Sequence, residues 1–169
     1  FILEVAKILK LKKNSLLRTL KKFKGLKYRQ EIVFQSKKLT IINDSKATTF
    51  SSSVSLLKSL TNVHWIVGGQ AKKGDKFLLS EKNCKNIKAY VFGTKRKFFT
   101  SKLKKLMEYE SFLDLESLVK KLFIEIKSKK NIRHTTILFS PSAASFDNFK
   151  NFEKRGKYFN QLIKKYINV

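Results

Sequence analysis

Polar and glycine-rich segments interrupt the apolar periodicity of this sequence at four places, where loops are expected instead of helix or strand faces. They are Gly25–Arg29, Ile42–Thr48, Gly68–Lys72 and Ser140–Gly156. Two of these segments contribute the lysines Lys46 and Lys72, and two contribute hydroxyl groups, at Thr48 and Ser145. Ammonium and hydroxyl groups can donate hydrogen bonds to carboxylate or phosphate oxygens. Taken alone, two lysines among 33 would be solvated surface residues, so the fold must decide whether they form a site.

The apolar pattern between these segments alternates between strands and helices. Expected strands are residues 31–35, 39–43, 64–67, 89–92 and 136–139, and expected helices are residues 50–60, 97–106, 113–126 and 148–166. The first two strands read as a hairpin with a polar turn at residues 36–38. Two helical patterns precede them, at residues 2–9 and 16–23, the second with Asn14 or Ser15 as its N-cap and Gly25 as its end.

This alternation predicts an α/β fold: a Rossmann-like, mainly parallel sheet with helices on both faces, an N-terminal β-hairpin and a short helical piece of a preceding domain. In such a sheet, binding loops follow the carboxyl ends of the strands. The segments after Ile42, Val67 and Phe139 fall at those ends. We expect a boundary near Gly25, with residues 1–24 outside the main domain and residues 25–169 within it. A first residue other than Met fits a chain that begins inside a longer protein.

The net charge of +26 at pH 7 suggests a polyanionic partner, but the residue types favour another interpretation. Only five of the 38 basic residues are arginine, the residue that binds guanine edges and phosphates in a bidentate manner. Lys, Ile, Asn and Phe are all abundant and share A/T-rich codons, so genomic base composition explains the excess. A basic nucleic-acid-binding module stays open as an alternative, although no nucleic-acid partner is expected.

Cys84 is the single cysteine, and the two histidines, His64 and His134, are far apart in sequence. An intramolecular disulfide is therefore impossible, and no metal site is expected. This cysteine usage fits the cytoplasm. No apolar run is long enough to cross a membrane, so no membrane association is expected.

The four segments, in this order and spacing, resemble the C-terminal domain of the Mur ligase family, in particular its D-glutamate-adding members. The family pattern runs G-L-x-H-R, then N-D-S-K-A-T, then G-G-x-x-K, then S-P-A-x-A-S-x-D-x-F-x-x-F-x-x-R-G. The resemblance covers nearly the whole chain, and its second and fourth blocks are highly specific. Tyr28 departs from the pattern, where the family usually has His, and the loop containing Lys72 and Lys73 is slightly longer.

The resemblance implies an ATP-dependent ligase that phosphorylates the carboxylate of UDP-N-acetylmuramoyl-L-alanine, after which the amine of D-glutamate attacks the acyl phosphate. Cations and preorganised donors should dominate such catalysis, because negative charge accumulates. The implied roles are ATP binding for Arg29 and Asp44, catalysis for Lys46, and D-glutamate binding for Thr48, Lys72, Ser145, Phe146 and Phe152, with Phe146 acting through its backbone amide.

Several of these residues also have structural interpretations. Asp44 could cap the helix near Phe50, and Ser145 could begin a helix with Asp147 as a further cap. Phe152 lies at helical spacing that fits the core. Arg155 could be an ion-pair partner, and Gly156 could permit close packing.

The phosphate-binding motif G-x-x-x-x-G-K-[ST] does not occur in the chain. In the resembled family that loop, the Mg²⁺ ligands and a uridine-nucleotide domain all precede this region. Residues 1–24 would then be the end of the central ATPase domain or a linker. We expect the chain to be inactive alone, to act with its own N-terminal and central domains, and to be monomeric. The nearest alternatives are a sister Mur ligase or a folylpolyglutamate-synthase-like ligase, although the Asp-Asn-Pro-Arg block of the diaminopimelate-adding enzyme does not occur.

Overall fold

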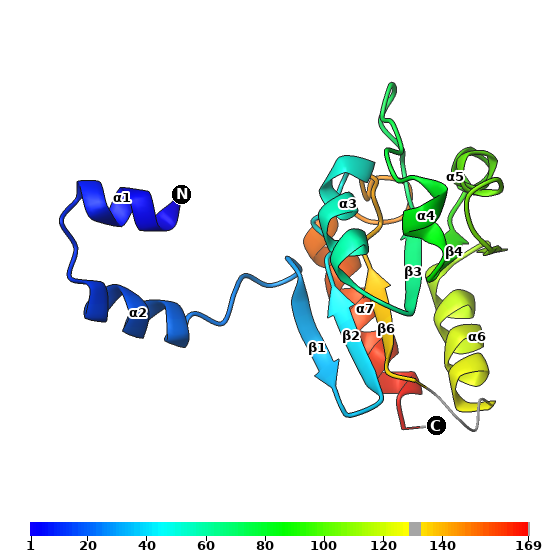
Figure 1. Cartoon of the computed structure of the whole chain (residues 1–169). Helices are drawn as coiled ribbons and strands as arrows, with labels where there is room; N and C mark the ends of the chain where they lie inside the picture. The colour runs from blue at the N-terminus through cyan, green and yellow to red at the C-terminus, as the bar shows by residue number, and fades with distance from the viewer. Residues whose placement is uncertain (129–132, 169) are drawn as a thin grey trace.

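Alternating strands and helices produce an α/β sheet in the computed structural model, which describes residues 1–128 and 133–168 (Figure 1). The strands are β1 (Glu31–Gln35), β2 (Leu39–Asn43), β3 (Val63–Gly68), β4 (Ile87–Phe92), β5 (Tyr109–Phe112) and β6 (Thr135–Phe139). The helices are α1 (Ile2–Ile8), α2 (Lys13–Lys22), α3 (Phe50–Ser59), α4 (Glu81–Cys84), α5 (Arg96–Leu103), α6 (Leu115–Ser128) and α7 (Phe152–Tyr166).

The six strands form one sheet in the order β1-β2-β6-β3-β4-β5. The β1–β2 hairpin is antiparallel, and the other pairs are parallel. All residues of β3 and β6 are buried, which matches their continuous apolar runs and is typical of interior parallel strands. The predicted α/β class, mainly parallel sheet and N-terminal hairpin are confirmed.

Two apolar layers hold helices against the two faces of the sheet. One layer packs α6 and α7 on the sheet through residues such as Leu122 and Phe159. The other packs α3 and α5 on the opposite face through Phe50, Leu57 and Phe99. Helices therefore cover both faces, as the sequence pattern predicts.

The carboxyl ends of β2, β6 and β3 lie at one edge of the sheet, because these strands pair in parallel. The segments that follow them, which begin at Asp44, Ser140 and Gly69, therefore emerge side by side (Figure 1). Three of the four segments that stood out in the sequence therefore lie together at the carboxyl ends of these strands.

Several predicted element bounds are wrong. Helix α7 begins at Phe152 and not at Asn148, because Asn151 is its N-cap and accepts a hydrogen bond from the Lys154 amide. Helix α2 begins at Lys13 after Lys12, so Asn14 and Ser15 lie inside the helix and do not cap it.

Two short elements have no counterpart in the sequence prediction. Strand β5 is a four-residue edge strand whose residues alternate between exposed and half-buried. Helix α4 has a single turn and buries Cys84. Both are too short for a clear periodic signal.

Helices α1 and α2 lie apart from the sheet, to which an extended segment joins them (Figure 1). Helix α2 buries none of its residues, and α1 buries only Ala6. Many of their large apolar side chains are exposed: Phe1, Ile2, Leu3, Val5, Ile8, Leu9, Leu11, Leu17 and Leu20. None of the helices in the described residues is long and apolar enough to span a membrane.

Candidate functional site

A cleft of about 450 Å³ lies at the carboxyl edge of the sheet, beside the end of β2. Four of the residues implied by the resemblance line it together: Arg29, Asp44, Lys46 and Thr48, with Gln30, Ala47 and Ser52 completing its wall. They come from two segments separated by the β1–β2 hairpin. The hairpin folds back on itself and so brings the turn before β1 beside the loop after β2.

Asp44 is held firmly at the floor of this cleft. Its carboxylate accepts hydrogen bonds from the Gln30 amide at 3.2 Å and from the Ser140 hydroxyl at 2.9 Å, and only 6% of the residue is exposed. Burial raises the pKa of Asp44 above its ordinary value, while Ser140, the Gln30 amide and the charge of Arg29 oppose that rise. Asp44 does not cap α3, because the Thr49 side chain accepts the hydrogen bond from the Ser52 amide.

Three buried serines form a hydrogen-bonded chain that ends on Asp44. The Ser53 hydroxyl lies 2.6 Å from those of both Ser140 and Ser142. Each hydroxyl has one proton. Because Ser140 donates to Asp44, Ser53 must donate to Ser140 if that contact is to be a hydrogen bond. The chain therefore links α3, the loop after β6 and the cleft. Ser53 was missed at the sequence level, although a serine at an inward position between Phe50 and Leu57 was the available signal.

Lys46 lines the cleft, and its backbone is held by the turn before β1. Its amide donates to the Tyr28 carbonyl at 3.0 Å, and its Nζ lies 4.2 Å from the centre of the Phe152 ring. Lys46 and Phe152, which the resemblance assigns to the same site, are thus in direct contact, although they are more than a hundred positions apart in the chain.

Arg155 is fully buried and joins the two principal loops of the site. Its guanidinium donates to the Ser45 carbonyl at 2.7 Å, to the Ser45 hydroxyl at 3.1 Å and to the Ala143 carbonyl at 2.9 Å. Burial lowers the pKa of Arg155 to about 10, and the charge of Asp147 opposes that change. Arg155 therefore stabilises the site without lining the cleft, and its hydrogen-bond acceptors are two carbonyls and a hydroxyl.

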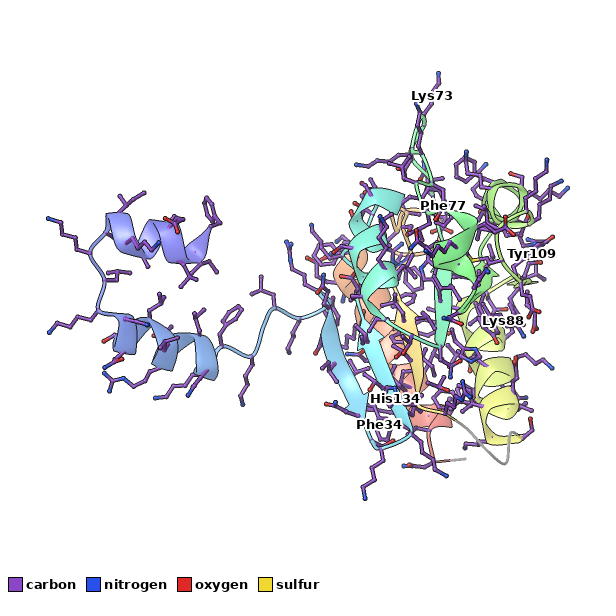
Figure 2. All side chains as sticks on the ribbon, viewed as in Figure 1. Phe34, Lys73, Phe77, Lys88, Tyr109 and His134 are labelled. Carbon is purple, nitrogen blue, oxygen red and sulfur yellow. The ribbon has the colours of Figure 1, made fainter. Side chains whose placement is uncertain are left out.

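Lys72, Ser145 and Phe146 lie outside the residues that line the cleft. Lys72 is exposed on the loop after β3, which projects away from the sheet with Lys73 at its tip (Figure 2). Ser145 is buried, and Phe146 is 71% exposed. The backbones of Gln70 and Ala144 nevertheless pair through two hydrogen bonds, so the loop carrying Lys72 and the loop carrying Ser145 are adjacent.

A second carboxylate, Asp147, lies at the same edge of the sheet. A Cβ atom at Gly93 would lie 2.9 Å from its Oδ2, so glycine permits this close approach. The other oxygen, Oδ1, is buried and has no hydrogen-bond partner among the described residues. Burial raises the pKa of Asp147, although nearby backbone amides and Arg155 act in the opposite direction. Neither Ser145 nor Asp147 caps α7, since Asn151 does so.

Side-chain groups that could ligate a metal are scarce in this chain. Residues 1–128 and 133–168 contain no group of three or more His, Cys, Asp or Glu side chains placed to hold an ion. Arg29 and Lys46, by contrast, place two cationic side chains in one cleft with Asp44. This set fits an anionic ligand that also carries hydroxyl groups.

Comparison with known proteins identifies relatives whose sequences are similar to that of this chain. No family model matches it, but individual proteins do. A UDP-N-acetylmuramoylalanine–D-glutamate ligase from Wolbachia sp. subsp. Brugia malayi is 38% identical over 162 residues, which are 95% of this chain. This chain is a homologue of the Mur ligases. The ligases of the same name from Rickettsia prowazekii and Francisella philomiragia are 32% and 34% identical over 96% and 85% of the chain.

The Mur ligase homology extends over only part of each relative. The chain spans 32%, 36% and 34% of the lengths of these three proteins, which is about a third. The matched region includes nearly all of the chain, as the four sequence blocks indicated.

Proposed function

We propose that this chain is the C-terminal part of an ATP-dependent ligase that adds D-glutamate to UDP-N-acetylmuramoyl-L-alanine in peptidoglycan precursor synthesis. The observation that carries the proposal is the gathering of Arg29, Asp44, Lys46 and Thr48 around one cleft. The names of these relatives, which specify a D-glutamate ligase, support the same choice. In this proposal residues 25–169 are the amino-acid-binding domain, and residues 1–24 are the end of the central ATPase domain or a linker.

The nucleotide is proposed to bind between Arg29 and Asp44, where it supplies the phosphoryl group that activates the substrate carboxylate. Both Asp44 oxygens already accept one hydrogen bond, and each has a second lone pair that could accept from a ribose hydroxyl. The Ser140 and Gln30 donors orient the carboxylate for that contact. Arg29 places a positive charge in the same cleft.

Lys46 is proposed as the catalytic cation. Among the described residues its ammonium makes no hydrogen bond or ion pair, so its N–H groups can donate to phosphate or acyl-phosphate oxygens. Preorganised donors stabilise such developing charge without reorganisation during the reaction. The Mg²⁺ that accompanies the nucleotide is proposed to be held upstream, since the described residues offer no ligand cluster.

D-Glutamate is proposed to bind where the loops after β2, β3 and β6 meet. Thr48 supplies a hydroxyl group from the cleft, and Phe152 lies beside Lys46. Lys72, Ser145 and the Phe146 amide are proposed to join them, because the Gln70–Ala144 pairing sets their loops side by side. Closure of the upstream domains would complete this site and exclude water.

The enzyme is proposed to work as a monomer in the cytoplasm. A sister ligase acting on another acidic amino acid is the main alternative, and the names of the relatives argue against it. Binding of nucleic acid is a weaker alternative, because exposed lysines occur on helices and loops throughout the chain instead of on one face.

The test uses the full-length protein that contains this chain. Phosphate release from ATP is measured with UDP-N-acetylmuramoyl-L-alanine and with D-glutamate, L-glutamate or no amino acid. We expect release to depend on D-glutamate and to fall on the order of 100-fold in Lys46→Ala, the cost of removing one charge-stabilising donor.

Lys37→Ala provides the matched control, because Lys37 is exposed in the hairpin turn at the far end of β2. Its activity should equal that of the wild-type enzyme. Phosphate release that ignores D-glutamate in a folded enzyme would contradict the proposed function.

A further inference from the structure

The segment that carries Lys46 is attached to the first turn of α7. The Ser45 hydroxyl donates to the Phe152 carbonyl at 2.9 Å, and the Asn43 side-chain amide donates to the Gly156 carbonyl at 2.9 Å. Arg155 donates in return to the Ser45 carbonyl. These contacts fix the backbone on the N-terminal side of Lys46, but they leave its long side chain to be held separately.

The Lys46 ammonium contacts the ring of Phe152. Its Nζ lies 4.2 Å from the ring centre, well within the range of a cation–π interaction. Two neighbouring features disfavour a cation here, because the amino end of α7 carries partial positive charge and Arg155 is buried one turn further on. The face of an aromatic ring is negative, so it stabilises the ammonium at this position.

A ring differs from a carboxylate as a partner for a catalytic lysine. A carboxylate would accept hydrogen bonds from the ammonium and would neutralise its charge. The Phe152 ring does neither, and no other described residue hydrogen-bonds to Lys46 Nζ. The ammonium is therefore held in place while its charge and its N–H groups stay available to an anionic ligand.

We propose that Phe152 is a positioning residue that holds the Lys46 ammonium through the face of its ring and directs it to the anionic oxygens formed during ligation. This inference rests on the proposed function. It assigns Phe152 a role that acts through Lys46, in addition to any contact with the amino acid.

The experiment replaces Phe152 in the full-length ligase with phenylalanines bearing one, two and three ring fluorines. Fluorination weakens the negative ring face with little change in shape. We expect kcat to fall stepwise, by about threefold to tenfold over the series, with KM for D-glutamate unchanged. Phe152→Tyr should retain most of the activity, and Phe152→Leu should lose more than the fluorinated variants.

Phe123 provides the matched control for this series. Lys127 Nζ lies 6.0 Å from its ring centre, and Phe123 is a residue of α6 that is buried in the layer between α6 and the sheet. Fluorination at Phe123 should leave kcat unchanged. A flat kcat series at Phe152 would show that the ring face does not hold the Lys46 ammonium. An increase in KM for D-glutamate with kcat unchanged would show that the ring acts only through contact with the amino acid, and either result would overturn the proposal.

A second measurement is independent of activity. In NMR spectra of the 169-residue chain, the Lys46 ε-methylene protons should lie upfield through the ring current of Phe152 and should return to ordinary values in Phe152→Leu. Unshifted protons in the wild-type chain would also overturn the proposal. If phosphate release ignored D-glutamate, the proposed function would fail instead, and the NMR shift would still decide whether Phe152 holds Lys46.

Discussion

Tyr28 and Gly156 fit together beside the cleft, although they are 128 positions apart in the sequence. A Cβ atom at Gly156 would lie 2.4 Å from the Tyr28 ring, so only glycine allows this contact. Tyr28 has a φ of 62°, and its carbonyl accepts from the Lys46 amide. The pair therefore connects α7 to the turn that carries Arg29, and the prediction that Gly156 permits close packing is confirmed.

We predict that Gly156→Ala destabilises the chain despite the better helix propensity of alanine. Overpacking against Tyr28 costs about 1–3 kcal/mol, which exceeds the gain of about 1 kcal/mol from propensity. In the Tyr28→Ala background the ring contacts at 2.4 and 2.7 Å are gone and only the Cβ contact at 3.1 Å remains, so the same substitution should cost much less. Urea unfolding of the four variants measures this coupling. Equal effects in both backgrounds would contradict it.

Asp44 should give the chain a distinctive pH dependence. Its folded pKa is raised by burial above the ordinary value of 3.8, so the ionised form destabilises the fold at neutral pH. This cost disappears as the pH falls through the folded pKa. Wild-type protein should therefore gain stability relative to Asp44→Asn between pH 7 and pH 4. Urea unfolding across this range measures the difference. The opposite slope would mean that the Ser140, Gln30 and Arg29 interactions outweigh burial.

At the scale of elements, α7 holds the loops of the site in position through hydrogen bonds. Its first turn receives the loop after β2 through Asn43 and Ser45, and its Arg155 also holds the loop after β6 at Ala143. The cleft-lining residues therefore owe their relative positions to a helix of which no residue lines the cleft.

We predict that Arg155→Ala lowers the free energy of unfolding by about 3 kcal/mol or more. The carbonyls of Ser45 and Ala143 would lose their donors in a place that water does not reach, and each such loss costs about 1–3 kcal/mol. Lys154→Ala is the matched control, because its side chain is exposed, and should change stability by less than about 0.5 kcal/mol. Chemical denaturation tests both variants. Similar free energies of unfolding for the two variants would contradict the idea that Arg155 holds the loops after β2 and β6 together.

At the scale of the whole molecule, the N-terminal helices contrast with the sheet domain. Their apolar side chains are exposed, whereas residues 31–166 build the two buried layers. Exposed apolar surface of this extent marks an interaction site. Because the relatives are about three times as long, we propose that the upstream part of the same polypeptide covers α1 and α2.

Deletion of residues 1–24 should leave the sheet domain intact. We expect residues 25–169 to unfold with the same free energy as the full chain to within about 0.5 kcal/mol, because α2 buries no residue and α1 only one. Binding of a hydrophobic dye should decrease. In the full-length ligase the same helices should become protected from hydrogen exchange. A large loss of stability on deletion would show that they belong to the sheet domain.

The sequence by itself determined the α/β class, the hairpin, the loops that carry polar groups and the resemblance to the Mur ligases. Periodic patterns report which face of an element is buried, and the motif residues are close together in sequence, so both are readable locally. The positions of Lys46 and Asp44 after β2 followed from the same pattern. Strand β5 was missed because four residues give no clear period, and the start of α7 was misplaced because its local N-cap, Asn151, was not recognised.

Only the tertiary structure decided how distant residues combine. The contacts of Lys46 with Phe152, Tyr28 with Gly156, and Arg155 with Ser45 and Ala143 leave no local pattern in the sequence. Parallel pairing of β2, β6 and β3 brings their carboxyl ends to one edge and thereby creates these contacts. The physical reason is that such pairs form across loops of many residues, where the free energy comes from packing and hydrogen bonding between elements and not from the preferences of neighbouring residues.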